Sequence, residues 1–187
     1  MLTAATLLTV ALLGLLSTQT VANPRAEPWL PPIRVSILLA CVASNLVVAW
    51  LRPVMQFYEV VSTRGSLVLR APASIVATAL TLGMSALATA GRDRAATYIF
   101  AALLGLGLVG ACLHLLTGIL LPWLYAISGL AFGYQTRVGT GGASLQPWAW
   151  IIDETTSSLH LAIGVLGGLI FALFGPPRIR TLTWVKR

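Results

Sequence analysis

One apolar run constrains this chain more than any other feature of its sequence. From Thr97 to Tyr134 the chain carries no Asp, Glu, Lys or Arg, and its only histidine there is His114. As a single helix, the run would extend about 57 Å at 1.5 Å per residue, nearly twice the ~30 Å hydrocarbon core of a bilayer. Because a turn also consumes residues, we expect one complete membrane span within this run rather than two.

The rest of the chain repeats this apolar character in shorter segments. Hydrophobic residues make up 57% of the 187 residues and charged residues only 9%, whereas a typical soluble domain is about 25% charged. We therefore predict an all-α fold, a polytopic integral membrane bundle of about five transmembrane helices in a single domain. The expected spans cover residues 2–22, 33–51, 73–90, 97–121 and 158–174.

Two connecting segments have a composition of their own. We expect Pro122 to bend the chain at the end of the fourth span, and the Trp and Tyr residues that follow it are typical of the membrane–water interface. Residues 122–134 are therefore predicted to be interfacial or re-entrant. Residues 53–72 form the least apolar stretch and are predicted to make a short hairpin or an interfacial loop that docks a partner.

The basic residues lie mostly in the gaps between the apolar segments. A net charge of +7 in that arrangement indicates topology signals and headgroup contacts rather than nucleic acid as a partner. With five spans, eight of the 12 Lys and Arg lie on the side of the C-terminus. The positive-inside rule then places the N-terminus outside and the C-terminus on the cytoplasmic or stromal side of a bacterial inner membrane or a thylakoid or other organelle membrane.

A few polar side chains lie inside the expected spans. Asn45 lies near the middle of the second span, where an unpaired amide is costly, so we expect it to face another helix. Cys41 and Cys112 both fall in apolar segments and are interpreted as small buried hydrophobic residues. The first segment begins without Lys or Arg, so we interpret it as a retained span rather than a signal peptide.

The two histidines of the chain lie in a weak internal repeat. Residues 113–120 align with residues 159–166, and each copy contains the pattern His-xxx-Gly. At four-residue spacing these side chains share one helical face. An imidazole with glycines one turn away suits a planar tetrapyrrole, because imidazole is a common axial ligand and the glycines leave room for the ring. The candidate metal ligands are His114 and His160, and the candidate clearance residues are Gly110, Gly118, Gly164 and Gly168.

Two other interpretations fit the same residues. A glycine face also packs against a neighbouring helix, and a membrane histidine also forms hydrogen bonds between helices; a proton relay is a third possibility. The depth of the histidines separates the tetrapyrrole versions. If the fourth span begins at Thr97, the two histidines lie at similar depth and favour one bis-histidine haem b. If a span begins near His114, they lie on opposite faces and each holds its own haem or pigment.

The stretch from His114 to Gly168 resembles small membrane b-type cytochromes of the cytochrome b561 and membrane-anchor kind. It is also similar to a four-helix membrane family of cyanobacteria and plastids, in which one His-xxx-Gly helix leads through a Gly- and Tyr-containing link to a second. The matching residues here are His114, Gly118, Gly129, Gly133, Tyr134, Gly139, His160 and Gly164. This resemblance implies a photosynthetic or respiratory membrane. With two histidines in all, a di-haem centre with four histidine ligands is excluded.

These observations together predict a small membrane subunit of an electron-transfer or photosynthetic complex. Its expected cofactor is haem b, with chlorophyll as the alternative, and its expected partners are the lipid bilayer and other membrane subunits. We expect no catalytic activity of its own, because the five acidic residues form no catalytic set. The alternative is a cofactor-free structural or assembly subunit that uses its small-residue faces and residues 53–72. A small transporter ranks third.

Overall fold

Six α-helices dominate the part of the chain that the structure describes. This computed structural model describes residues 2–22, 32–61, 67–89, 94–136, 143–152 and 157–175. The helices are α1 (Leu2–Leu16), α2 (Val35–Val61), α3 (Leu67–Thr89), α4 (Arg94–Leu113), α5 (Leu115–Phe132) and α6 (Ser157–Phe174). The strands β1 (Thr20–Val21) and β2 (Ile33–Arg34) pair antiparallel, as do β3 (Tyr134–Thr136) and β4 (Ala143–Leu145), and the 3₁₀ helix η1 (Pro147–Ile152) follows. The predicted all-α fold is confirmed.

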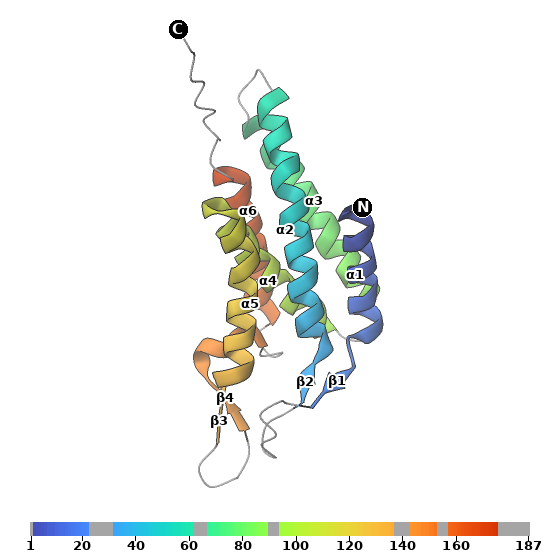
Figure 1. Ribbon diagram of the computed structural model, residues 1–187, viewed down its shortest axis with the longest axis vertical. Helices are drawn as coiled ribbons and strands as arrows, with labels where there is room; N and C mark the ends of the chain where they lie inside the picture. The colour runs from blue at the N-terminus through green and yellow to red at the C-terminus, as the bar shows by residue number, and fades with distance from the viewer. Residues whose placement is uncertain are drawn as a thin grey trace.

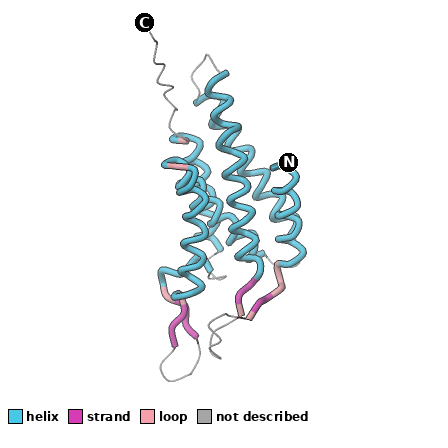
Figure 2. Tube along the Cα trace, viewed as in Figure 1, coloured by secondary structure: helices cyan, strands magenta, loops and turns pink. Residues whose placement is uncertain are grey.

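The helix α4 forms the centre of the bundle. It contacts α2, α3, α5 and α6, while α1 packs against α2 and α3 at the periphery. Its side chains Phe100, Leu103, Leu104 and Leu108 are fully buried. Figure 1 shows that the axes of the helices are roughly aligned. Both strand pairs, magenta in Figure 2, extend from the same end of the bundle.

Two helices are long and apolar enough to cross a membrane, in place of the roughly five that the sequence predicted. Among the described residues these are α4 and α5, and four apolar helical segments are shorter. The first helix, α1, ends at Leu16, whereas the first predicted span ended at residue 22. It ends early because Thr20 and Val21 pair with β2 and the amide of Gln19 donates to the carbonyl of Leu16 at 3.0 Å. The four shorter segments are Ala4–Leu16, Val35–Leu51, Thr78–Leu87 and Ser158–Phe174.

The second predicted span ends too early. The helix α2 continues past Leu51 and through Pro53 to Val61, because a proline removes one backbone hydrogen bond without forcing a helix to end. Its partner α3 begins at Leu67, so most of the stretch 53–72 is helical rather than a loop. The predicted turn around Arg64 lies outside the described residues.

The long apolar run forms a helical hairpin rather than a single span with a re-entrant tail. The helices α4 and α5 have 20 and 18 residues and are separated by His114 alone, whose φ of −154° and ψ of 151° are extended. A single extended residue reverses the chain here because glycines let the two helices meet directly at the turn. A turn of one residue leaves enough chain for two long helices. The predicted interfacial stretch 122–134 is therefore largely the second half of α5, which continues through Pro122.

The presence of α5 as a separate helix determines at which end of the bundle the last helix, α6, ends. Successive helices run in opposite directions, so the start of α1 and the end of α6 lie toward the same end of the bundle (Figure 1). The sequence predicted opposite sides for the two ends because it counted five helices. Because the apolar run 97–134 forms two helices, α4 and α5, the number of described helices is even.

Asn45 joins α2 to α5, as its position in the sequence predicted. In the orientation that satisfies both of its polar atoms, the amide nitrogen donates to the carbonyl of Ile119 at 3.1 Å and the amide oxygen accepts from Trp123 Nε1 at 2.5 Å. These contacts lie in the turn that Pro122 interrupts, where a helix loses backbone hydrogen bonds. The thiol of the buried Cys41 lies 3.9 Å from the carbonyl oxygen of Pro122 in the same interface.

Candidate functional site

His114 lies at the tip of the α4–α5 hairpin and its side chain is exposed. Its Nδ1 accepts a hydrogen bond from the backbone N–H of Leu116 at 3.2 Å, which caps the first turn of α5. An Nδ1 that accepts carries no proton, so in the neutral ring the proton is on Nε2. A metal bond at Nε2 would require the proton to move to Nδ1 and the cap to break. The local geometry therefore assigns His114 to the helix terminus.

His160 is fully buried in the first part of α6. Its ring packs against Trp150 of η1, with centroids 5.6 Å apart and planes inclined by 47°. Trp150 in turn packs against Tyr125 of α5 at 5.8 Å and 49°. The hydroxyl of Tyr125 donates to the backbone carbonyl of Trp148. These three rings, which we term the aromatic cluster, connect α5, η1 and α6.

The structure does not bring the two histidines together. Gly164 lies against Ala101 and Gly167 against Gly105, so α4 and α6 run in the same direction. Gly164 is level with Ala101, so His160, four residues earlier in α6, is level with Thr97, near the start of α4. His114, in contrast, follows the last residue of α4. At 1.5 Å per residue the histidines are about 25 Å apart along the bundle.

A single bis-histidine haem does not fit this separation. A metal–imidazole bond is about 2 Å long, so two axial nitrogens lie about 4 Å apart. The arrangement agrees with the second sequence-based alternative, in which a span begins near His114 and the histidines lie at opposite ends. Within the described ranges, no group of three or more His, Cys, Asp or Glu side chains is placed to hold a metal ion.

Most of the predicted clearance glycines are occupied by helix packing. A Cβ atom at Gly110 would lie 2.9 Å from the carbonyl oxygen of Thr117, and one at Gly118 would lie 2.8 Å from Cβ of Ala111. A Cβ at Gly164 would lie 2.8 Å from the carbonyl oxygen of Ala101. These three glycines therefore let α5 and α6 approach the backbone of α4, which leaves no space for a ring on their faces. The contacts support the packing interpretation of the glycine pattern.

Gly168 is different from the other three. A Cβ there would meet only the side chain of Thr78 in α3, with Cγ2 at 3.3 Å and Oγ1 at 3.6 Å. A cavity of about 130 Å³ opens beside these two residues. Gly168 therefore lines this cavity, on the face of α6 toward α3.

Sequence reasoning missed two features of this region. The aromatic cluster joins residues that are separated by the strand pair β3–β4, and nothing in their spacing indicates that they meet. The involvement of Gly105 and Gly167 was also missed, although they are part of the tightest α4–α6 contact: a Cβ at Gly105 would overlap the carbonyl of Ile163, and one at Gly167 would overlap the backbone of Gly105. The abundance of glycine in these two helices was the available signal.

The geometry of this region thus describes a closely packed helical core, with His114 and His160 at its two ends. Comparisons with models of known protein families, with curated proteins and with solved structures found no match to this chain.

Proposed function

We propose that this chain is an integral membrane protein that serves as a structural subunit, a rigid helical body placed between lipid and other membrane subunits. The observation that carries the proposal is the exposure of α5. The apolar window of α5 has a mean hydropathy of 1.8, but only 22% of its residues are buried, whereas 72% of the residues in the corresponding window of α4 are buried. In a soluble protein an apolar helix of this kind belongs in the core, because large exposed apolar patches mark interaction or membrane surfaces.

Exposed apolar side chains line the outer sides of both α5 and α6. On α5 they recur at helical spacing, so they lie along one side of the helix; they are Leu116, Leu120, Leu124 and Ile127. On α6 the corresponding side chains are Leu159, Val165, Leu166, Leu169 and Leu173. A hydrocarbon environment solvates such a face without cost, whereas water does not.

The interior supports a structural role rather than a cofactor-binding role. The close glycine contacts hold α5 and α6 to α4, and the Asn45 bridge holds α2 to α5. Small residues that permit close backbone approach, together with hydrogen bonds between helices, are what stabilises helix association in lipid. A body of this kind keeps its shape while its outer faces contact neighbouring subunits.

One observation favours a second candidate function. His160 is an ionisable residue fully buried in the proposed membrane domain, and such residues are functional candidates by default. A haem b or chlorophyll held by His160, or by His114 separately, in an electron-transfer or photosynthetic complex is therefore the competing proposal. It requires further ligands that come from outside the pair of histidines.

Three measurements on the native protein test the proposal. After alkaline washing of membranes, the chain should remain in the membrane pellet; recovery in the supernatant would refute membrane integration. After mild solubilisation, it should migrate in a native gel within an assembly much larger than its 19.8 kDa. The detergent-purified chain should lack a reduced-minus-oxidised haem band and extractable chlorophyll. A haem b band or bound chlorophyll would replace the structural proposal with the second candidate.

The orientation is a further part of the proposal. With the start of α1 and the end of α6 toward one end of the bundle, we place both termini on the cytoplasmic or stromal side, since the C-terminal segment carries four basic residues. Reporter fusions at the two termini should give the same compartment. Opposite compartments would show that an odd number of helices crosses the membrane.

A further inference from the structure

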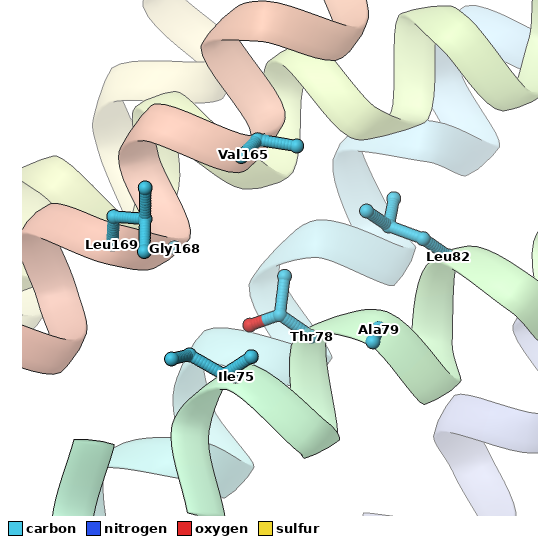
Figure 3. A pocket seen from close by; sticks show the side chains of 7 residues that line it. All are labelled: Ile75, Thr78, Ala79, Leu82, Val165, Gly168 and Leu169. Carbon is cyan, nitrogen blue, oxygen red and sulfur yellow. The ribbon is translucent and has the colours of Figure 1, made fainter. Parts of the chain in front are cut away.

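A small cavity lies between α3 and α6 (Figure 3), and three of its lining side chains, Ile75, Val165 and Leu169, are exposed. Its volume is about 130 Å³. Ile75 and Leu82 of α3 and Val165 and Leu169 of α6 contribute apolar side chains to its lining. The space exists because Gly168 has no side chain at this point and Ala79 has a short one.

One polar group interrupts this apolar lining. Thr78 is only 5% exposed, and its Oγ1 has no hydrogen-bond partner among the described residues. Figure 3 shows the Thr78 side chain between α3 and α6, with its methyl group toward Val165 and this oxygen on the side of Gly168 and Leu169. A threonine in a helix usually satisfies its hydroxyl on the preceding turn, and a buried hydroxyl without a partner is costly. The arrangement is therefore suited to an occupant that brings a hydrogen-bonding atom.

The volume indicates how large a part of the occupant the cavity can hold. An engineered apolar cavity of about 150 Å³ in another protein stays dry and binds benzene, so a cavity of about 130 Å³ accommodates one six-membered ring. The apolar lining suits the face and edges of such a ring. The Thr78 hydroxyl can both donate and accept one hydrogen bond, so it suits a single oxygen substituent.

We propose that the cavity between α3 and α6 binds a small aromatic alcohol, with its ring against the apolar lining and its hydroxyl hydrogen-bonded to Thr78 Oγ1. This ligand site goes beyond the structural role proposed above. Of the residues predicted to form a tetrapyrrole site, it uses Gly168 alone. The occupant enters from the side of the bundle, because the cavity is open toward the surface between the two helices.

The test compares phenol with toluene, two probes of nearly equal size that differ in the hydroxyl. The full chain in detergent is labelled on its Ile, Leu and Val methyl groups, and the shifts of Ile75 and Val165 are followed in NMR titrations. We expect saturable shifts with both probes and tighter binding of phenol by about fivefold, which is what one net hydrogen bond contributes. Thr78→Val keeps the shape of the side chain and should weaken phenol binding to the level of toluene while leaving toluene unchanged.

Two further variants keep the result interpretable. Thr81→Val is the matched control, because the Thr81 hydroxyl donates to the carbonyl of Thr78 at 3.0 Å and Thr81 does not line the cavity; it should leave both affinities unchanged. Gly168→Ala places a methyl group 3.3 Å from Cγ2 of Thr78 and should weaken both probes. Shifts that never saturate would reduce the effect to partition into the micelle and overturn the proposal. Equal affinity for phenol in the wild type and in Thr78→Val would overturn it as well.

Discussion

The substitution Gly164→Ala separates the packing role of the glycines from ring clearance. A Cβ at this position would lie 2.8 Å from the carbonyl oxygen and 3.1 Å from Cβ of Ala101. Ordinary van der Waals contact begins at 3.4 Å, so α6 must move away from α4 by about 0.6 Å, which forfeits a substantial part of the contact energy of neighbouring atoms. Overpacking of this kind costs about 1–3 kcal/mol. Alanine itself favours a helix over glycine by about 1 kcal/mol in water, so any loss of stability must come from the packing.

This effect is measured by thermal unfolding in detergent, with a thiol-reactive dye as the reporter of unfolding. Cys41 is fully buried and reports unfolding once Cys112, which is half-buried, has been replaced by Ser. At about 2–4 °C per kcal/mol for a chain of this size, the unfolding temperature of Gly164→Ala should fall by roughly 2–12 °C.

The control for this experiment is Gly83→Ala, because nothing lies within 4 Å of a Cβ at Gly83 in α3. Its unfolding temperature should stay the same or rise. If Gly164→Ala and Gly83→Ala unfold at the same temperature, the argument that α4 and α6 are held together through Gly164 is refuted.

Three other predictions address the remaining contacts. Asn45→Leu removes the bridge to Ile119 and Trp123 and should destabilise the protein by about 0.5–2 kcal/mol; in a double-mutant cycle with Trp123→Phe the two effects should not add, and full additivity would contradict the hydrogen bond. His114→Ala should cost about 1 kcal/mol through the lost cap, and His114→Ser should restore it; failure of serine to restore stability would contradict the capping role. Leu124→Arg on the exposed face of α5 should oppose membrane insertion by about 2.5–3.5 kcal/mol, and normal recovery of this variant in the membrane fraction would contradict a lipid-facing α5.

The interior of the bundle was predictable from the sequence where a residue is stable in only one kind of environment. Asn45 in an apolar segment needs a partner, and in this chain the partner had to come from another helix. Cys41 was correctly predicted to be buried. In contrast, the end of α2 was predicted too early, because Pro53 disrupts one hydrogen bond and the apolar residues beyond it continue to favour the helix.

The candidate site was only partly predictable, because the four-residue spacing fits either one continuous helix or two helices that meet at His114. Gly110, His114 and Gly118 share a face if the helix is continuous. The structure breaks the helix at His114, so Gly110 and Gly118 instead face each other across the hairpin. The prediction of a continuous span assumed that a turn needs several residues. That assumption fails when glycines on both sides allow the helices to touch immediately beyond the turn.

The sequence by itself determined that the chain is helical and that its apolar residues exceed what a small interior can bury. Helix propensity and hydropathy are properties of individual residues, so both can be determined from the sequence without knowledge of the fold. The tertiary structure alone decided that His114 ends a helix while His160 is buried about 25 Å away along the bundle. It also decided that Gly164 contacts a backbone while Gly168 borders a cavity. These outcomes depend on which helix lies opposite each residue, and that pairing arises only when the whole bundle packs.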